Sequence, residues 1–507
     1  MAGKLEIERK YELPDAFTLP DLTGVGGVTA VGEPDDQRLD AVYYDTAGLH
    51  LARGRVTLRR RTGGNDAGWH LKRPAGGERS ELQLPADNRQ ESPPRAVTDQ
   101  VRALTRGAGL APVARIRTHR VERALKAADG STVALLADDR VSTESLRDGG
   151  GAREWHELEI ELVDGDPEAL DRLDAALRRA GARPATSPSK LAQALGPDYP
   201  QPAGVRKGGS RSRRALTAYL AAQRDALVAQ DPHVREGDAE AVHKMRVATR
   251  RLRSTLRSFG PLLTDGSHDR AALDRLHDEI KWVTGLLGEV RDCDVMRERL
   301  AGLVHAEPPQ LVLGPVAARI TSLLAARAAE ARRALVAGLD SRRYTDLLDA
   351  IDALVLRSVR PERVPRRRLL RRARKALRRA DARLAAADAG PDTGLDTAAV
   401  DERRHEARKA YKRARYAAEL VAPVAGKAAT RLAGRVTALQ DALGAHQDAL
   451  VTGELLRQYG ISAYAAGENA FTYGLLHARA DEHGRLALRD VPKARRKVRK
   501  AAEALFG

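Results

Sequence analysis

The chain has 507 residues, enough for more than one domain, and its 87 basic and 69 acidic residues give a net charge of +18. Its single cysteine, Cys293, excludes an internal disulfide framework and a thiolate metal cage. The N-terminal segment lacks an apolar signal core and no apolar run is long enough to cross a bilayer, so we expect a cytoplasmic protein.

The positive charge is confined to one part of the chain. Residues 1–200 have a net charge of −3, whereas residues 201–507 have a net charge of +21. An excess of this size implies an anionic partner such as nucleic acid, a membrane surface or polyphosphate. We expect that partner to bind the second part of the chain.

The first part consists of short extended segments separated by turns. Eight segments have strand character, which is typical of a closed or sandwiched antiparallel sheet. Two helices are expected, over 94–107 and 167–181, the second with Pro167 at its start and Gly181 past its end. The predicted strands are Leu5–Glu12, Leu39–Asp45, Arg55–Arg61, Trp69–Lys72, Arg79–Leu84, Arg115–Leu125, Thr132–Asp138 and Glu154–Val163.

The first predicted strand has charge on one of its faces. Side chains alternate across a strand, so Glu6, Glu8 and Lys10 share one face. A strand at a solvated edge would have the same pattern, and this segment alone favours that interpretation. A functional interpretation therefore depends on charged partners elsewhere in the sheet.

A second acidic row lies on the last predicted strand, where Glu157, Glu159 and Glu161 share one face. Adjacent like charges repel one another unless cations lie between them, and at least three other strands carry rows of Arg or Lys. If these faces meet inside a closed sheet, the carboxylates suit Mg²⁺ or Mn²⁺ and the basic residues suit phosphate oxygens. The alternative is a barrel with an apolar core and a charged exterior.

Several short motifs follow one another along this part in a characteristic order. They are EIERK at 6–10, YYDT at 43–46, LRRR at 58–61, HLK at 70–72, RSE at 79–81, ADD at 137–139, ELEIE at 157–161 and SK at 189–190. Over about the first 195 residues the chain thereby resembles the CYTH domain of the triphosphate tunnel metalloenzymes. The resemblance implies an antiparallel barrel that binds a triphosphate-bearing substrate with a divalent metal, and a catalytic centre at Glu6, Glu8 and Lys10.

Carried over position by position, the resemblance implies two groups of ligands. The metal ligands would be Glu6, Glu8, Asp138, Glu157, Glu159 and Glu161. The phosphate ligands would be Lys10, Arg59, Arg61, Lys72, Arg79, Arg117, Arg120 and Lys190. By strand parity Arg117 faces opposite to Arg120, so it is the less secure of the two. Phosphoryl transfer needs charge neutralisation and positioning, which these two groups would supply.

A stretch rich in Pro, Gly and Ser separates this part from the rest. We place the first domain at 1–198, a linker at 199–210 and an all-helical domain at 211–507, because strand signals vanish beyond the linker. The helical domain contains an internal duplication. Residues 242–259 align without gaps to 404–421, and Leu287–Val295 matches Leu443–Val451, so we expect two related halves at about 211–360 and 361–507.

The duplicated segments carry stripes of His, Arg and Lys at helical spacing. Such a stripe is usually a solvated helix face, but the same residue types at the same offsets in both copies favour a binding role. From about Arg211 to the C-terminus the chain resembles the CHAD domain, which implies binding of inorganic polyphosphate. The expected contacts, which include two arginines of a further basic helix, are His243, Arg246, Arg250, Arg253, Arg257, Arg371, Arg374, His405, Arg408, Lys412, Arg413, Arg415 and His446.

Nucleic acid is the rival ligand for so basic a domain. Proteins that bind single strands usually add aromatic stacking platforms, but the whole chain contains only four Phe and three Trp. The basic helices also lack a zinc-finger or heptad signature. We therefore expect polyphosphate rather than nucleic acid, and no membrane partner.

Together these features predict an α+β multidomain protein: an N-terminal eight-stranded antiparallel β tunnel barrel with flanking helices, followed by an all-α bundle with an internal two-fold repeat. We expect a divalent-metal-dependent hydrolase of triphosphate or polyphosphate that uses Mg²⁺ or Mn²⁺, with a helical domain that binds polyphosphate. One alternative is a non-catalytic protein that binds polyphosphate deposits or acts as a scaffold. Nucleotide cyclisation on the same barrel is another.

Overall fold

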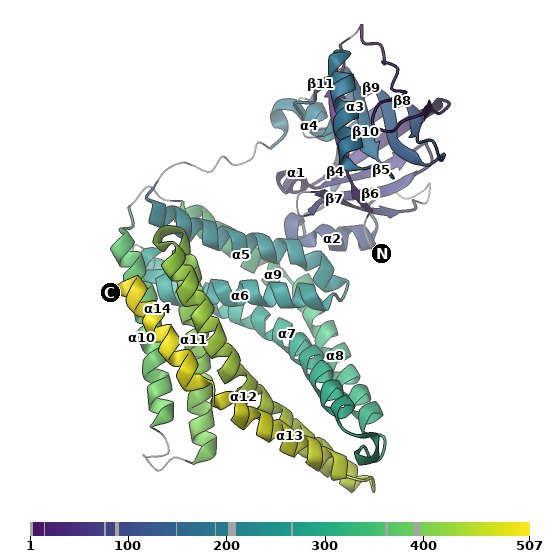
Figure 1. The fold of residues 1–507 in the computed structure, drawn as a ribbon. Helices are drawn as coiled ribbons and strands as arrows, with labels where there is room; N and C mark the ends of the chain where they lie inside the picture. Colours follow the sequence, from purple (N-terminus) through teal and green to yellow (C-terminus); the bar gives the residue numbers. More distant parts are fainter. Residues whose placement is uncertain are drawn as a thin grey trace. The chain divides into compact units, whose positions relative to one another are not determined.

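The computed structural model describes residues 4–14, 16–75, 78–86, 91–148, 150–187, 189–200, 209–264, 267–359, 363–389 and 396–507. The chain divides into two compact units, Met1–Val205 and Arg206–Gly507 (Figure 1). The expected linker at 199–210 spans this division, and its residues 201–208 lie outside the described ranges.

The first unit is built on one antiparallel sheet of eleven strands, in the order β1-β7-β6-β5-β4-β8-β9-β10-β2-β11, with β3 paired to β8. Every predicted strand segment contains a strand. The strands are β1 (Lys4–Glu6), β2 (Glu8–Glu12), β3 (Ala30–Val31), β4 (Asp35–Asp45), β5 (Thr57–Thr62), β6 (Gly68–Ala75), β7 (Glu78–Leu84), β8 (Ala111–Lys126), β9 (Thr132–Ser145), β10 (Ala152–Leu162) and β11 (Arg183–Pro184).

The N-terminal segment pairs with both ends of this sheet. β1 pairs with β7, and after a break at Ile7 the chain continues as β2, which pairs with β10. The edge strands of the described sheet, β1 and β11, are not paired with each other. The sheet is therefore not closed, and the expected eight-stranded barrel is not confirmed.

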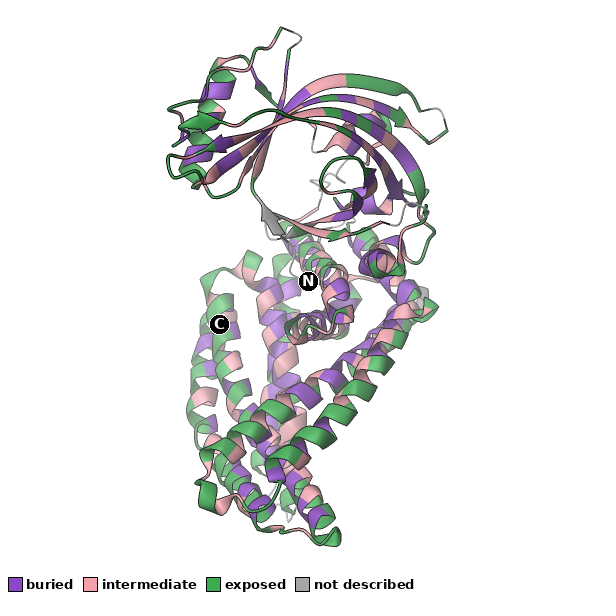
Figure 2. Cartoon of the chain, turned by 90° about the vertical axis from the view of Figure 1, so that its right-hand side faces the viewer, coloured by how far each residue is buried: buried purple, intermediate pink, exposed green. Residues whose placement is uncertain are grey.

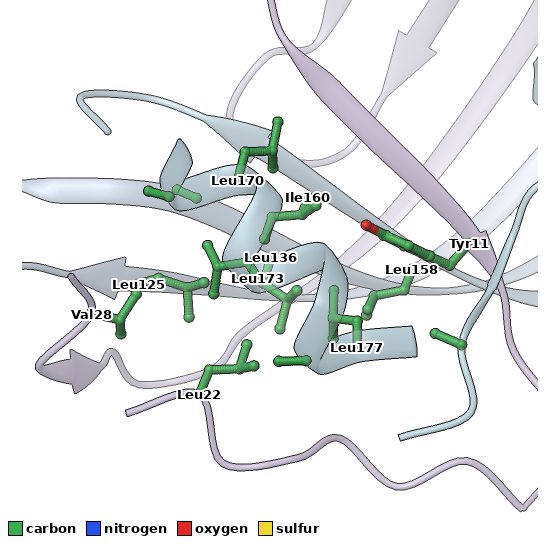
Figure 3. Close-up of a cluster of buried hydrophobic side chains, with 14 of the residues drawn as sticks. Tyr11, Leu22, Val28, Leu125, Leu136, Leu158, Ile160, Leu170, Leu173 and Leu177 are labelled. Carbon is green, nitrogen blue, oxygen red and sulfur yellow. The ribbon is translucent and has the colours of Figure 1, made fainter. Parts of the chain in front are cut away.

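One face of the sheet, which we call the outer face, packs against helices. Leu136, Leu158 and Ile160 lie against α3 (Pro167–Arg179), which contributes Leu170, Leu173 and Leu177 (Figure 3). A second cluster joins Leu58, Trp69 and Leu71 to Val97 and Val101 of α2 (Arg95–Thr105). Burial of each such side chain stabilises the fold by about 1.5–3 kcal/mol. The sheet curls around an interior (Figure 2), and the face toward that interior is called the inner face. Because side chains alternate, the neighbours of these residues lie on this inner face.

The register fixes which residues share the inner face, because directly opposed residues of antiparallel strands point the same way. This face carries both acidic rows and the basic rows that the sequence predicts. The cross-strand pairs are Glu8 with Glu161, Lys10 with Glu159, Glu157 with Asp139, Asp139 with Arg120, Tyr43 with Arg59, Arg59 with His70, and Lys72 with Glu81.

Part of the inner face is apolar and is covered by short helices. Ala41, Tyr43 and Ile116 belong to a buried cluster with residues of α1 (His50–Arg53) and α4 (Lys190–Leu195), among them Leu191 and Leu195. The sequence did not predict α4. The expectation of an apolar interior thus holds for one part of this face, and charged residues occupy the rest.

The second unit is helical, and its described residues include no strand. Its helices are α5 (Arg211–Arg235), α6 (Ala239–Phe259), α7 (Ser267–Ala306), α8 (Val316–Asp340), α9 (Arg342–Ser358), α10 (Arg366–Asp388), α11 (Thr397–Ala425), α12 (Lys427–Ala465), α13 (Phe471–Leu488) and α14 (Val491–Phe506). One core joins α10, α11, α12 and α14, and another joins α7, α8, α12 and α13. None of the described helices combines the length and the apolar character that a membrane span needs.

Candidate functional site

Three carboxylates meet on the inner face of the sheet. Asp139 on β9 and Glu157 and Glu159 on β10 each offer an oxygen within 4.8 Å of the other two. Asp139 and Glu157 are buried, and the side chain of Glu159 is 13% exposed. The indole nitrogen of Trp155 donates to Oε2 of Glu157 at 2.5 Å and holds that carboxylate in place. Such a group requires cations, because burying carboxylates without compensation is costly.

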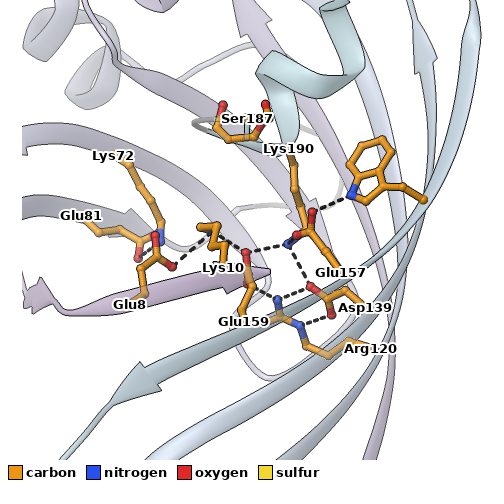
Figure 4. A network of polar contacts seen from close by, with 12 residues as sticks. Glu8, Lys10, Lys72, Glu81, Arg120, Asp139, Glu157, Glu159, Ser187 and Lys190 are labelled. Atoms are coloured by element: carbon orange, nitrogen blue, oxygen red, sulfur yellow. Dashed lines mark hydrogen bonds and ion pairs between the residues drawn. The ribbon is translucent and has the colours of Figure 1, made fainter. Parts of the chain in front are cut away.

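Lys190 lies among all three carboxylates (Figure 4). Its Nζ is 2.9 Å from Oδ2 of Asp139, 2.6 Å from Oε1 of Glu157 and 2.9 Å from Oε1 of Glu159. Lys190 is the first residue of α4, and the hydroxyl of Ser189 caps that helix by accepting from the backbone N–H of Ala192 at 3.1 Å. The cap and the buried leucines of α4 therefore position the ammonium group.

Two further cations complete the cluster. Nε of Arg120 donates to Oδ1 of Asp139 at 2.8 Å, and its Nη2 lies 2.7 Å from both Oδ2 of Asp139 and Oε2 of Glu159. The ammonium group of Lys10 bonds to Glu159 and lies 3.3 Å from Oε2 of Glu8. Three cations thus lie among the three carboxylates, and one of them, Lys10, also contacts the carboxylate of Glu8.

The mutual attraction keeps these groups charged. Burial alone would raise the pKa of Glu159, but Lys10 and Lys190 outweigh it and hold that pKa well below its usual value. Burial would likewise lower the pKa of Lys190, yet the carboxylates raise it. Glu159 and Lys190 therefore stabilise each other's charged forms.

A mainly basic group lies on the neighbouring strands of the same face. Nη1 of Arg59 donates to the hydroxyl of Tyr43 at 3.3 Å, and Arg61 forms an ion pair with Asp66. Burial, together with Arg59 and Arg120, lowers the pKa of Arg61 to about 9. The buried Nε atoms of Arg59 and Arg61 have no hydrogen-bond partner within the described part of the chain. These guanidinium groups therefore favour a bound anion.

A histidine and a glutamate complete this inner-face group. Nδ1 of His70 is 2.8 Å from Oε1 of Glu81, and its Nε2 is 2.7 Å from the carbonyl oxygen of Asp66. Glu81 Oε2 also lies 3.5 Å from Nζ of Lys72. Burial lowers the pKa of His70. Each ring nitrogen lies within hydrogen-bond distance of an acceptor oxygen, and the contact with Glu81 holds that carboxylate in place.

In the helical unit, an arginine on each of two helices makes the same contacts. Nη2 of Arg246 on α6 lies 3.4 Å from Oδ1 of Asp292 on α7, and Nη2 of Arg408 on α11 lies 3.8 Å from Oδ1 of Asp448 on α12. Each arginine also lies against a glycine, since a β-carbon at Gly288 would be 3.7 Å from Nε of Arg246, and one at Gly444 would be 3.0 Å from Nη2 of Arg408.

These arginines belong to a group of cations between α6 and α11. The pKa of Lys412 is lowered to about 6 by burial and by Arg250, Arg408 and Arg246. The Nε atoms of Arg246 and Arg408 are buried and lack a hydrogen-bond partner in the described ranges. These cations repel one another, so an anion placed among them would stabilise their charged forms.

Comparison with known proteins assigns both units. The CYTH domain model matches residues 4–186, and the CHAD domain model matches residues 218–457. The chain is a CYTH–CHAD protein. The CYTH superfamily includes triphosphatases and cyclases, and its triphosphate tunnel enzymes use divalent metals. The two families relate to triphosphate and polyphosphate substrates, which supports a triphosphate-related function for this CYTH–CHAD protein.

Relatives of the same length exist in Mycobacterium tuberculosis. The uncharacterized proteins MT2285 of strain CDC 1551 and Rv2226 of strain H37Rv are each 37% identical over 523 residues, which cover 98% of this chain and 98% of each relative.

Solved structures also resemble parts of the CYTH–CHAD chain. PptA from Streptomyces chartreusis matches with a TM-score of 0.45 and 22% identity, over 57% of this chain and all of its own. The CHAD domain from the plant Ricinus communis matches with a TM-score of 0.43 and 24% identity, over 59% of this chain and 93% of its own. HpAC1 from Hippeastrum, a putative adenylyl cyclase described as having a dominant triphosphatase activity, matches with a TM-score of 0.24 and 19% identity, over 37% of this chain and 93% of its own.

The structure brings most of the predicted CYTH residues to one face. Glu6 and Arg79 are paired in the sheet, but their side chains lie outside the described part of the structure. The others on the inner face are Glu8, Lys10, Arg59, Arg61, Lys72, Arg120, Glu157, Glu159, Glu161 and, from α4, Lys190. Their roles as metal and phosphate ligands remain predictions.

Two predicted CYTH residues lie on the outer face, so the expectation that they reach the site is wrong. Asp138 is opposite Leu158, and its Oδ1 lies 2.6 Å from Nε2 of His156. Arg117 is half exposed, and its Nε lies 3.8 Å from Oδ2 of Asp40. Asp139, one residue on, takes the place of Asp138, because alternation puts adjacent residues on opposite faces.

Sequence reasoning also missed Asp139, Tyr43 and Glu81 as members of the site. All three stand inside the motifs ADD, YYDT and RSE, so the motifs located the segments but not the side chains. The register between β8 and β9, which places Arg120 opposite Asp139, is what selects Asp139 over Asp138, and the sequence does not supply it.

In the CHAD domain, the surroundings of His446 do not favour its predicted role. It is buried, with Nε2 2.8 Å from Oδ1 of Asp401 and Nδ1 3.2 Å from the carbonyl oxygen of Gly484. Both nitrogens therefore have partners within the protein, which argues against the predicted contact of His446 with polyphosphate.

The other predicted CHAD residues are half-buried or exposed. On α6 these are His243, Arg246, Arg250, Arg253 and Arg257, and on α11 they are His405, Arg408, Lys412, Arg413 and Arg415. Arg371 and Arg374 on α10 are exposed and lie on a different stripe from the residues of α10 that line a pocket with α6 and α11.

Proposed function

We propose that this CYTH–CHAD protein is a divalent-metal-dependent triphosphatase that hydrolyses a phosphoanhydride bond of inorganic triphosphate or of a polyphosphate end. The observation that carries the proposal is the meeting, on one inner face, of three carboxylates with a group of Arg and Lys residues from at least three neighbouring strands. Carboxylates beside guanidinium and ammonium groups supply a metal site next to a phosphate site.

The three carboxylates fit a hard divalent cation. Their ligand atoms are all oxygens, which Mg²⁺ and Mn²⁺ prefer. Lys190 Nζ lies within 2.9 Å of one oxygen of each, so the space among them accommodates a cation. Mg²⁺ or Mn²⁺ bound at Asp139, Glu157 and Glu159 would polarise phosphate oxygens and lower the pKa of a bound water.

The cations of the cluster gain a second role in this arrangement. When the carboxylates bind a divalent ion, Lys10, Arg120 and Lys190 lose their partners and can turn to phosphate oxygens. The negative charge of a triphosphate then offsets the positive charge that the ion adds to the cluster. Metal and triphosphate are therefore expected to bind together, with Arg59 and Arg61 extending the phosphate site.

The proposal is tested by phosphate release from tripolyphosphate in Mg²⁺ or Mn²⁺. Glu159→Gln removes one charge from the carboxylate group and is expected to lower turnover about 100-fold. Glu154→Gln is the matched control, because Glu154 is on the same strand but exposed. Absence of phosphate release by the wild-type protein with either metal would contradict the enzyme assignment and favour a binding role. A panel with thiamine triphosphate and ATP would identify the preferred head group.

For the CHAD domain, the proposal is that polyphosphate binds among the cations between α6 and α11. The equal contacts of Arg246 and Arg408 support two related halves with this group at their junction. Phosphate oxygens would accept hydrogen bonds from their unpartnered Nε atoms and would raise the lowered pKa of Lys412 by stabilising its ammonium form. Such binding would hold the protein on polyphosphate deposits in the cytoplasm.

A further inference from the structure

The contacts between α6 and α11 differ on their two sides. The gapless alignment of residues 242–259 with 404–421 pairs Arg251 with Arg413, and Arg257 with Glu419. If the halves were equivalent, Arg251 would face Glu419 in the same way that Arg413 faces Arg257. The second pair, however, consists of two arginines. The two sides therefore have opposite electrostatic character.

The side with Arg251 is neutralised within the protein. Nε of Arg251 donates to Oε2 of Glu419 at 3.0 Å, and the hydroxyl of Tyr219 on α5 lies 3.2 Å from the same oxygen. The guanidinium groups of Arg251 and Arg415 also lie over the ring of Tyr416, at 5.7 and 4.7 Å from its centre. A carboxylate and an aromatic face thus satisfy these arginines.

The side with Arg413 opens into a basic pocket instead. A pocket of about 590 Å³ lies between the end of α6, α10 and α11, which contact one another (Figure 1). Six basic residues line it, and the remaining lining residues are one serine and three alanines. The basic residues are Arg257, Arg372, Lys375, Arg379, Arg383 and Arg413.

These six cations have little compensation. Arg383 lies 3.1 Å from Oε2 of Glu406, but the other five form no ion pair within the described part of the chain. The pKa of Arg413 is lowered by burial and by Arg383 and Arg257. Repulsion of this kind is costly unless an anion occupies the pocket.

The lining also narrows the chemistry of the ligand. Arg372, Lys375, Arg379 and Arg383 are spaced at i, i+3, i+7 and i+11, so one face of α10 presents them together. Among the described residues that line the pocket there is no aromatic side chain on which a base could stack and no acidic side chain that could accept from one. A ligand that presents anionic oxygens on every side meets these conditions.

We infer that this pocket binds phosphate groups of inorganic polyphosphate, as a site additional to the cations around Arg246 and Arg408. The inference rests on the proposed polyphosphate binding by the CHAD domain. Because the opposite side is closed by Glu419, the bound chain extends toward α10 and not toward α5. Polyphosphate binding is thus one-sided.

The natural asymmetry supplies the test. Position 257 aligns with Glu419 of the other half, so Arg257→Glu makes the two positions the same. Arg413 then gains a carboxylate partner, as Arg251 has in Glu419. We therefore expect this variant to fold. Arg379→Glu is a second pocket variant. Arg378→Glu is the matched control, because Arg378 is adjacent on the same helix, exposed and outside the pocket lining.

Binding of inorganic polyphosphate to the full chain is measured at several salt concentrations. We expect Arg257→Glu and Arg379→Glu to weaken polyphosphate binding about 10-fold at low salt. The slope of the logarithm of the binding constant against the logarithm of salt concentration should become smaller by about one to two for each variant. Arg378→Glu should bind as wild type does. If the pocket variants and the control variant bind polyphosphate with equal affinity, the inference that polyphosphate binds in this pocket is wrong. Single-stranded RNA that competes as well as polyphosphate would overturn the ligand assignment. A wild-type chain that does not bind polyphosphate would contradict the proposed function itself.

Discussion

Lys190 determines how the three inner-face carboxylates can be used. Its ammonium group contacts an oxygen of each, at 2.6 to 2.9 Å. A divalent ion at the same carboxylates would need the space that Nζ now fills. Metal binding and movement of this side chain are therefore linked.

We predict that Lys190→Met lowers stability without metal and makes the protein more responsive to metal. Removal of one cation from a buried ionic cluster costs about 3 kcal/mol, and a divalent ion that takes its place restores the balance. Thermal unfolding followed by circular dichroism, with and without Mn²⁺, measures both effects. Arg117→Met on the outer face is the control. An equal Mn²⁺ effect on Lys190→Met and wild type would contradict the linkage.

Lys412 makes a different prediction, about protons. Its pKa is lowered to about 6, so in the unliganded protein its amine is mostly neutral at pH 7.5. Phosphate favours the ammonium form, so polyphosphate binding at pH 7.5 is expected to take up about one proton. Calorimetric titration in two buffers with different ionisation enthalpies measures the uptake. The variant Lys412→Met should bind more weakly and take up no proton from this position, and an unchanged uptake would exclude Lys412 as the source.

The same group has a consequence for stability. Between pH 6 and the usual lysine value of 10.5, the unfolded chain binds more protons at Lys412 than the folded chain does. The contribution of Lys412 to the free energy of unfolding therefore rises with pH across this window.

At the scale of single residues, the sequence predicted the segments of the site better than its side chains. The motif ADD placed an aspartate at the inner face, but a one-residue error selected Asp138, which contacts His156 outside. On α10 the arginines form several stripes, and the buried residues Leu369, Ala373 and Leu377 decide which of them faces α11. Pattern alone does not distinguish arginines on a solvated stripe from those at a pocket.

Among the elements, α4 has an influence beyond its length. Its buried residues Leu191 and Leu195 anchor it in the apolar part of the inner face, and its first residue is Lys190. Six residues are too few for a helical pattern to be recognised in sequence. The break at Ile7 is equally hidden, because residues 5–12 alternate as one continuous strand would.

We predict that Ser189→Ala alters catalysis through the position of Lys190. Loss of the N-cap hydrogen bond costs about 1 kcal/mol and loosens the turn that holds the ammonium group. Tripolyphosphate turnover should fall severalfold, while urea unfolding shows only this small loss. Ser341→Ala removes the equivalent cap of α9 in the CHAD domain and should leave turnover unchanged. Equal turnover by Ser189→Ala and wild type would show that the cap does not position Lys190.

For the whole molecule, the division into two units predicts separable functions. Arg246→Glu combined with Arg408→Glu should weaken polyphosphate binding at least 10-fold and leave tripolyphosphate turnover near that of wild type. The combination of Arg378→Glu with Arg435→Glu changes the charge by the same amount at two exposed positions outside the predicted contacts and is the control. Glu159→Gln should show the reverse pattern, with normal binding and lost turnover. Parallel loss of both properties in any one variant would contradict separable functions.

Two-domain organisation and the class of each unit were predictable, because strand alternation and the charge excess both change near residue 200. Closure of the sheet was not. Whether edge strands pair depends on how far a sheet curls, which no local pattern encodes.

The pairing of the N-terminal segment also determines when its contacts can form during translation. β1 and β2 are translated well before their partners β7 and β10, and β10 ends only at Leu162. Contacts so distant in sequence form slowly. Glu8 and Lys10 therefore cannot reach their final neighbours until most of this unit has been translated.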